Sequence, residues 1–210
     1  MSDRRKPIDP GAYTLDYFLT DCEGHEEYRE TAGRVLPARL RAALADAGPL
    51  AGRRVLDLGC GRGEVVRYCL SEGATVVGAD YAPAALSLAR RILPGEAPGL
   101  VRSDAKRLPF AEGAFDVVFM LDLVEHLLPD ELAAAYREVW RVLAPGGRLV
   151  IHTMPNLWYY RFGYPLFRLV QRLRGVRLPR DPRLRSQEQH VHVNEQTLLT
   201  MRSDLRVAGF

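Results

Sequence analysis

The chain has 210 residues, of which 47% are hydrophobic and 26% are charged, and its formal net charge is +3. These values are typical of one soluble domain with a sizeable core, and the small net charge gives no overall nucleic-acid signature. Cys22, Cys60 and Cys69 form no C-x-x-C pair, which argues against a disulfide framework or a zinc site. With a polar start and no long apolar run, we expect a cytoplasmic protein without a signal peptide or a membrane span.

Helical and strand patterns alternate along the chain. Residues 26–47 have apolar residues at helical spacing, with a break expected at Pro37. Further helices are expected at 64–72, 83–93, 129–143 and 195–208. Strands are expected at 55–58, 74–80, 100–102, 115–122 and 148–154, the last after a turn at 144–147. This order predicts an α/β fold, a Rossmann-like doubly wound and mostly parallel sheet with helices on both faces.

A glycine-rich turn at 59–63, G-C-G-R-G, joins the first expected strand to the next helix. Such a turn lies at the edge of a parallel sheet where ligands bind. The dinucleotide fingerprint is G-x-G-x-x-G, and here Glu64 takes the position of its third glycine, where a carboxylate repels a pyrophosphate unless it points away. Asp57 suits a cationic group such as an ammonium. These residues therefore argue against an NAD-dependent oxidoreductase.

Several segments, in the expected order, resemble motifs of the class I S-adenosylmethionine-dependent methyltransferases. They are V-L-D-L-G-C-G-R-G at 55–63, G-A-D ending at Asp80, S-D-A at 103–105, and Y-R-E-V-W-R-V-L-A-P-G-G-R-L-V-I at 136–151. The resemblance covers about residues 50–154 and is nearest to small-molecule enzymes of the ubiquinone-biosynthesis type. It implies S-adenosyl-L-methionine as cofactor, S-adenosyl-L-homocysteine as product, and methyl transfer to an O, C or N atom of a small or lipid-linked acceptor.

The resemblance also implies a set of cofactor-binding residues. Asp80 is expected to hold the ribose hydroxyls and Asp104, or the amide of Ala105, to meet the adenine. Backbone carbonyls of Leu121 and Asp122 are expected to reach the methionine ammonium. The full expected set is Asp57, Gly59, Cys60, Gly61, Gly63, Asp80, Tyr81, Ser103, Asp104, Ala105, Leu121 and Asp122. Within it, Cys60 is expected to be a small buried residue rather than a nucleophile.

Glu125 and His126 follow the fourth expected strand and are the catalytic candidates. An unperturbed histidine titrates near neutrality, so His126 could be a general base that lines the acceptor pocket together with Glu125. The alternative is a carboxylate at a helix start beside a partly exposed histidine. No spacing motif predicts a metal site, although His152, His190 and His192 could add ligands. A non-catalytic module that keeps the fold is the alternative function.

The stretch 155–185 is rich in aromatic residues and arginines, and Asp181 is its one acid. One face of a basic amphipathic helix is expected to carry Phe167, Leu169, Val170 and Leu173. This pattern is typical of a lid over the acceptor site or of contact with an anionic membrane surface through 158–185, and core packing is the third reading. No RNA-recognition motif accompanies the charge, which argues against nucleic acid as partner.

We expect a single domain with four segments. Residues 1–48 form an arm and helix over the cofactor site, 49–154 the S-adenosylmethionine-binding core, 155–193 the basic aromatic insertion and 194–210 a C-terminal helix. Within the arm, the residues expected over the cofactor are Tyr13, Tyr17, Phe18 and His25. The family's final β-hairpin is missing after the last helix, so either the chain is truncated or the sheet ends at five strands. An exposed sheet edge would favour a homodimer.

Overall fold

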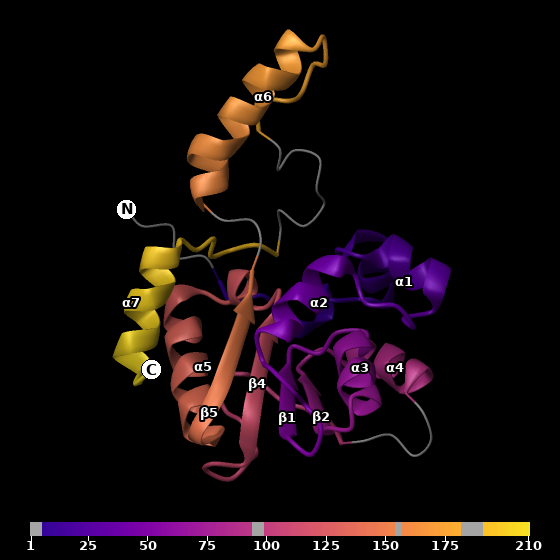
Figure 1. The fold of residues 1–210 in the computed structure, drawn as a ribbon, viewed down its shortest axis with the longest axis vertical. Helices are drawn as coiled ribbons and strands as arrows, with labels where there is room; N and C mark the ends of the chain where they lie inside the picture. The colour runs from indigo at the N-terminus through magenta and orange to yellow at the C-terminus, as the bar shows by residue number, and fades with distance from the viewer. Residues whose placement is uncertain (1–5, 94–98, 154–156, 182–190) are drawn as a thin grey trace.

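The computed structural model describes residues 6–93, 99–153, 157–181 and 191–210 (Figure 1). The strands are β1 (Arg54–Leu58), β2 (Thr75–Asp80), β3 (Leu100–Arg102), β4 (Phe115–Leu121) and β5 (Leu143–His152). They form one sheet in the order β3-β2-β1-β4-β5, and all neighbours pair in parallel. The Rossmann-like α/β fold predicted from the sequence is thereby confirmed. The strand order reverses between β1 and β4, where ligands bind in such sheets.

Helices cover both faces of this sheet, except for α6 (Tyr164–Leu173), which lies away from it (Figure 1). The others are α1 (His25–Thr31), α2 (Ala38–Ala45), α3 (Glu64–Ser71), α4 (Pro83–Ile92), α5 (Pro129–Val142) and α7 (Leu198–Ala208). Short turns of helix are η1 (Pro10–Ala12), η2 (Tyr17–Asp21), η3 (Val124–His126) and η4 (Tyr159–Gly163). The break expected at Pro37 is confirmed, because Pro37 lies directly before α2. Among the described residues, the helices are too short and too polar for any of them to cross a bilayer.

Neighbouring residues of one strand belong to different hydrophobic clusters. Val117 and Phe119 of β4 pack in a cluster with residues of α2 and α3, whereas Val118 and Met120 pack with residues of α5. A strand that is buried on both faces reads as a continuous apolar run, which explains F-D-V-V-F-M-L in β4. The two layers hold the carboxyl ends of the strands, and the loops that follow them, in fixed positions.

The prediction of a turn at 144–147 before the fifth strand was wrong. β5 begins at Leu143, where α5 ends, because Leu143 pairs with Phe115 and is buried there. Pairing then resumes with Arg148 opposite Val117, so residues 144–147 form a bulge within the strand. The expected end of this strand at Met154 lies outside the described residues.

The last helix begins three residues later than expected. Thr197 precedes α7, and its side chain accepts a hydrogen bond from the amide of Thr200 at 3.1 Å. A threonine at this position caps the free amides of the first turn, so the helix starts after it. The apolar face expected around Leu169 and Leu173 does lie on one helix, α6.

Candidate cofactor and acceptor site

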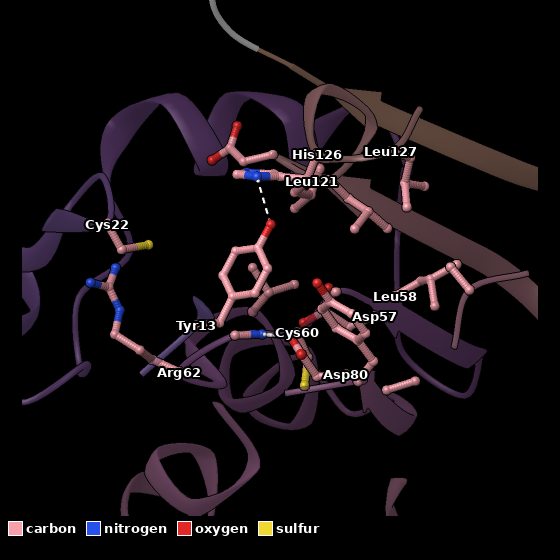
Figure 2. A pocket seen from close by; sticks show the side chains of 18 of the residues that line it. Tyr13, Cys22, Asp57, Leu58, Cys60, Arg62, Asp80, Leu121, His126 and Leu127 are labelled. Atoms are coloured by element: carbon pink, nitrogen blue, oxygen red, sulfur yellow. Dashed lines mark hydrogen bonds between the residues drawn. The ribbon is translucent and has the colours of Figure 1, made fainter. Parts of the chain in front are cut away.

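A pocket lies at the carboxyl ends of β1, β2 and β4 (Figure 2). Every expected cofactor-binding residue except Gly63 lines it. These residues are Asp57, Gly59, Cys60, Gly61, Asp80, Tyr81, Ser103, Asp104, Ala105, Leu121 and Asp122. They come from the ends of strands and from the loops that follow β1, β2, β3 and β4, which the parallel sheet brings to one edge.

Gly63 is not among the residues that line the pocket, and its expected role in cofactor binding stays a prediction. Its φ is +86°, and a Cβ at this position would lie 2.8 Å from the Cβ of Ala89. The glycine therefore allows the start of α3 to pack against α4. Gly61, in contrast, lines the pocket, and its amide donates a hydrogen bond to Asp80 Oδ2 at 2.9 Å.

Two backbone amides fix the carboxylate of Asp80 at the end of β2. Gly61 donates to one oxygen, and Ala82 donates to the other at 2.8 Å. Burial raises the pKa of Asp80, and these hydrogen bonds oppose that shift. A carboxylate has about four acceptor sites, so lone pairs remain for ligand hydroxyl groups.

Asp57 is a buried acid at the floor of the pocket. Asp57 is 2% exposed, and its Oδ2 has no hydrogen-bond partner among the described residues. Burial, together with the nearby carboxylates of Asp80 and Glu64, raises the pKa of Asp57 to about 8. The carboxyl group is therefore mostly neutral at pH 7. A cationic ligand group would compensate both the missing hydrogen bond and the repulsion.

The loop after β3 brings Ser103, Asp104 and Ala105 to the pocket wall. The carboxylate of Asp104 accepts from the Lys106 amide at 2.9 Å and pairs with the Lys106 ammonium at 3.1 Å. Lys106 also binds Glu131 at 2.7 Å. Asp104 thus stabilises its own turn, and contact with an adenine ring by Asp104 or Ala105 stays a prediction.

Aromatic residues of the N-terminal segment cover one side of the pocket. Tyr13, Tyr17 and Phe18 line it, and the Tyr13 ring lies edge-to-face 5.6 Å from Tyr81. The fourth expected cover residue, His25, is not among the lining residues, and its ring Nδ1 lies 3.2 Å from the carbonyl oxygen of Cys22. Side chains from the far N-terminal segment therefore do reach the carboxyl edge of the sheet.

Arg62, which the sequence reading did not select, holds this segment in place. Its guanidinium donates to the carbonyl oxygens of Phe18 at 2.9 Å and Glu23 at 3.0 Å. It also pairs with Glu64 at 3.0 Å, so this carboxylate is engaged by an arginine beside the glycine turn. The opposite charges of Arg62 and Glu64 in G-R-G-E were the sequence signal that could have indicated this ion pair.

Asp122 follows β4 with a left-handed backbone, at φ +53°. His152 Nδ1 lies 2.6 Å from its Oδ1, and Arg39 of α2 forms an ion pair with its other oxygen. Burial acts to raise the pKa of Asp122, but His152 and Arg39 together hold it below its usual range. These partners occupy the side chain of Asp122. The expected contact between its backbone carbonyl and a ligand ammonium stays a prediction. A non-glycine residue held in this conformation is often found at a functional site.

His126 lines the pocket opposite Asp57 and Asp80, and the Tyr13 hydroxyl points toward it (Figure 2). Its Nδ1 lies 3.0 Å from the Tyr13 hydroxyl and 3.1 Å from the carbonyl oxygen of Val191. A carbonyl only accepts hydrogen bonds, so Nδ1 carries the proton and Nε2 keeps a lone pair. Burial, with help from His192, lowers the pKa of His126 to about 3. The ring is therefore neutral at pH 7.

Glu125 is not among the pocket-lining residues, and its expected catalytic role stays a prediction. It is 1% exposed, and its Oε2 accepts from the Thr153 hydroxyl at 2.8 Å. Potential ligand atoms of Glu125, His126 and His192 lie within 4.8 Å of one another. This trio could hold a metal ion, a grouping that sequence spacing did not predict. His190 lies outside the described residues.

Comparison with known proteins gives consistent results. Residues 56–151 match a family model described as a methyltransferase domain. A demethylmenaquinone methyltransferase from Thermus thermophilus is 43% identical over 121 residues, which are 55% of this chain and 53% of that protein. A ubiquinone biosynthesis O-methyltransferase from Acinetobacter baylyi is 32% identical over 136 residues, 62% of this chain and 55% of that protein. The chain thus spans about half the length of the curated relatives it matches.

The fold also has solved counterparts. The crystal structure of an S-adenosylmethionine-dependent methyltransferase from Mesorhizobium loti has a TM-score of 0.63 and 24% identity, covering 82% of this chain and 81% of that chain. At this identity the structural similarity shows a shared fold only. The match to the family model covers residues 56–151. Residues 56–151 therefore resemble a methyltransferase domain, and the chain has the fold of solved S-adenosylmethionine-dependent methyltransferases; the two curated relatives are named for quinone biosynthesis.

Proposed function

We propose that this protein transfers the methyl group of S-adenosylmethionine to an O, C or N atom of a small acceptor. The observation that carries the proposal is the buried Oδ2 of Asp57, which has no hydrogen-bond partner among the residues that the structure describes and lies close to the fixed carboxylate of Asp80. The cofactor has an ammonium, which would pair with Asp57, and a ribose diol, which would donate hydrogen bonds to Asp80. An NAD pyrophosphate would instead meet two acids in this pocket.

The chain's own residues position the reactants and exclude water. Asp57 and Asp80 would hold the ammonium and the ribose, and the cover of Tyr13, Tyr17 and Phe18 would keep water from the reacting atoms. The bound cofactor supplies a methyl group on a sulfonium, so the protein contributes mainly orientation and electrostatics. As a new bond forms to the acceptor, the neutral ring of His126, which lines the pocket, would receive the proton that a hydroxyl acceptor loses.

For the acceptor we propose an aromatic ring that carries a hydrophobic chain. Relatives named for menaquinone and ubiquinone biosynthesis support this class. The wall formed by Tyr13, Tyr17 and Leu127 offers apolar and aromatic contacts to such a ring.

Isothermal titration calorimetry with S-adenosylhomocysteine tests the cofactor assignment, with NAD as the control ligand. We expect binding of S-adenosylhomocysteine alone, and loss of that binding in Asp80→Asn. Binding of NAD alone would overturn the proposal. Turnover is then measured as methyl transfer from labelled S-adenosylmethionine to a panel of hydroquinones that carry short hydrophobic side chains. Cofactor binding without transfer to any acceptor would favour a non-catalytic module.

A further inference from the structure

The helix α6 and its flanking residues 157–181 form a basic projection from the molecule. Figure 1 shows α6 away from the sheet, beyond the end to which the β5 arrow points. Among the described elements, α6 packs mainly against η4, which directly precedes it. The projection is joined to the body at its base, where the Leu157 amide donates to the carbonyl oxygen of Gln196 at 3.1 Å.

One face of α6 is apolar and exposed. Leu166, Leu169 and Leu173 follow each other at helical spacing, and they are 64%, 55% and 81% exposed. Phe167 and Val170 widen the same face and are 46% and 39% exposed. Exposed apolar side chains scattered singly are normal, but a contiguous face of this kind marks a surface that contacts another apolar medium.

The start of α6 is anchored to its own chain. Tyr164 is 5% exposed, and its hydroxyl donates to the carbonyl oxygen of Pro179 at 2.9 Å. The returning segment of chain therefore covers the side of the helix that carries Tyr164 and leaves the apolar face outward. This arrangement gives the apolar face a fixed orientation.

Charge identifies the partner. Residues 157–181 contain six arginines and one acid, Asp181. Two copies of this surface would repel each other, whereas an anionic surface would attract it. Exposed aromatic residues at the base, Trp158 and Tyr159, are of the type found at membrane interfaces. We propose that the apolar face of α6, with its arginines, binds the surface of an anionic lipid bilayer. The proposal does not depend on the catalytic activity.

Flotation of the full chain with lipid vesicles tests this. We expect binding to vesicles that contain one quarter phosphatidylglycerol, weak binding to pure phosphatidylcholine, and a loss of binding at 0.5 M salt. Leu166→Ser with Leu173→Ser should reduce binding about 100-fold, because two leucines no longer enter the apolar layer. Arg172→Glu with Arg174→Glu should reduce it at least about 20-fold on anionic vesicles.

Matched controls come from α7, whose outer face is equally exposed. Leu199 and Val207 are 67% and 82% exposed, so Leu199→Ser with Val207→Ser removes similar apolar area elsewhere. Arg202→Glu with Arg206→Glu is the corresponding charge control. Unchanged vesicle binding in the α6 variants, equal losses in the α7 controls, or no binding by the parent chain would overturn the proposal. So would a dimer, measured by light scattering, that the α6 leucine variant disrupts.

Discussion

Replacing Asp57 by asparagine should stabilise the ligand-free protein at neutral and alkaline pH while weakening cofactor binding. Asparagine has nearly the shape of a neutral aspartic acid, so it removes only the ability to ionise. In the folded chain the pKa of Asp57 is raised to about 8 from an ordinary value of 3.8. The unfolded chain therefore ionises this group freely, and the folded chain does not.

The sign and size of the effect follow from proton linkage. Between about pH 4 and pH 8 the folded state holds one proton on Asp57 that the unfolded state has lost. The free energy of unfolding therefore falls by roughly 1.4 kcal/mol per pH unit in this range. The cumulative cost above pH 8 is on the order of 5 kcal/mol, an upper bound because local relaxation reduces it. The Asp57→Asn variant avoids this cost, because its side chain does not titrate in either state.

Urea unfolding, followed by circular dichroism at several pH values from 5 to 9, measures the effect. The difference in unfolding free energy between Asp57→Asn and the parent should grow with pH and level off above 8. Asp116→Asn is the matched control, because the Arg54 guanidinium lowers the pKa of Asp116 to about 2 and this side chain lies near the surface. Its effect should be constant over the same range. Parallel pH curves for the parent and Asp57→Asn would refute the reasoning.

The same group links cofactor binding to protons. If an ammonium ionises Asp57, binding of S-adenosylhomocysteine near pH 7 should release a proton, seen as a dependence of the calorimetric enthalpy on the buffer's own ionisation enthalpy. Asp57→Asn should abolish this release and weaken binding. A buffer-independent enthalpy in the parent would show that Asp57 does not meet the ammonium.

Further predictions concern the glycine turn and the candidate base. Gly63→Ala should destabilise the fold by about 2–3 kcal/mol in urea unfolding, because its Cβ would meet Ala89 at 2.8 Å at a positive φ. Gly52→Ala, with φ +72° and open space, should cost only about 1 kcal/mol, and equal costs would contradict the packing role. His126→Ala should lower kcat about 100-fold with S-adenosylhomocysteine affinity unchanged. Because the pKa of His126 is lowered to about 3, the parent's kcat should show no inflection near pH 6.5 from this residue.

The sequence predicted the sheet well because its signals are local. β4 is an unbroken apolar run buried on both faces, and the G-x-G-x-G turn marks the end of β1. The contribution of Arg62 could not be read in this way. Its partners, Phe18 and Glu23, are about 40 residues earlier in the chain, and only the folded topology brings them together. The packing role of Gly63 could not be read from the sequence for the same reason, since the neighbour that demands a glycine is on α4.

Three residues selected from the sequence as site residues have properties that no local sequence pattern shows, and these properties share a physical cause. Asp57 Oδ2 has no hydrogen-bond partner in the described part of the chain, Asp122 has a left-handed backbone, and His126 is a buried histidine kept neutral. Each costs folding free energy, so selection for stability alone would remove them. A ligand that supplies a cation to Asp57 would offset part of this cost on binding. Ligand affinity and apo stability should therefore change in opposite directions when Asp57 is neutralised, whereas Gly63→Ala should lower apo stability through packing alone.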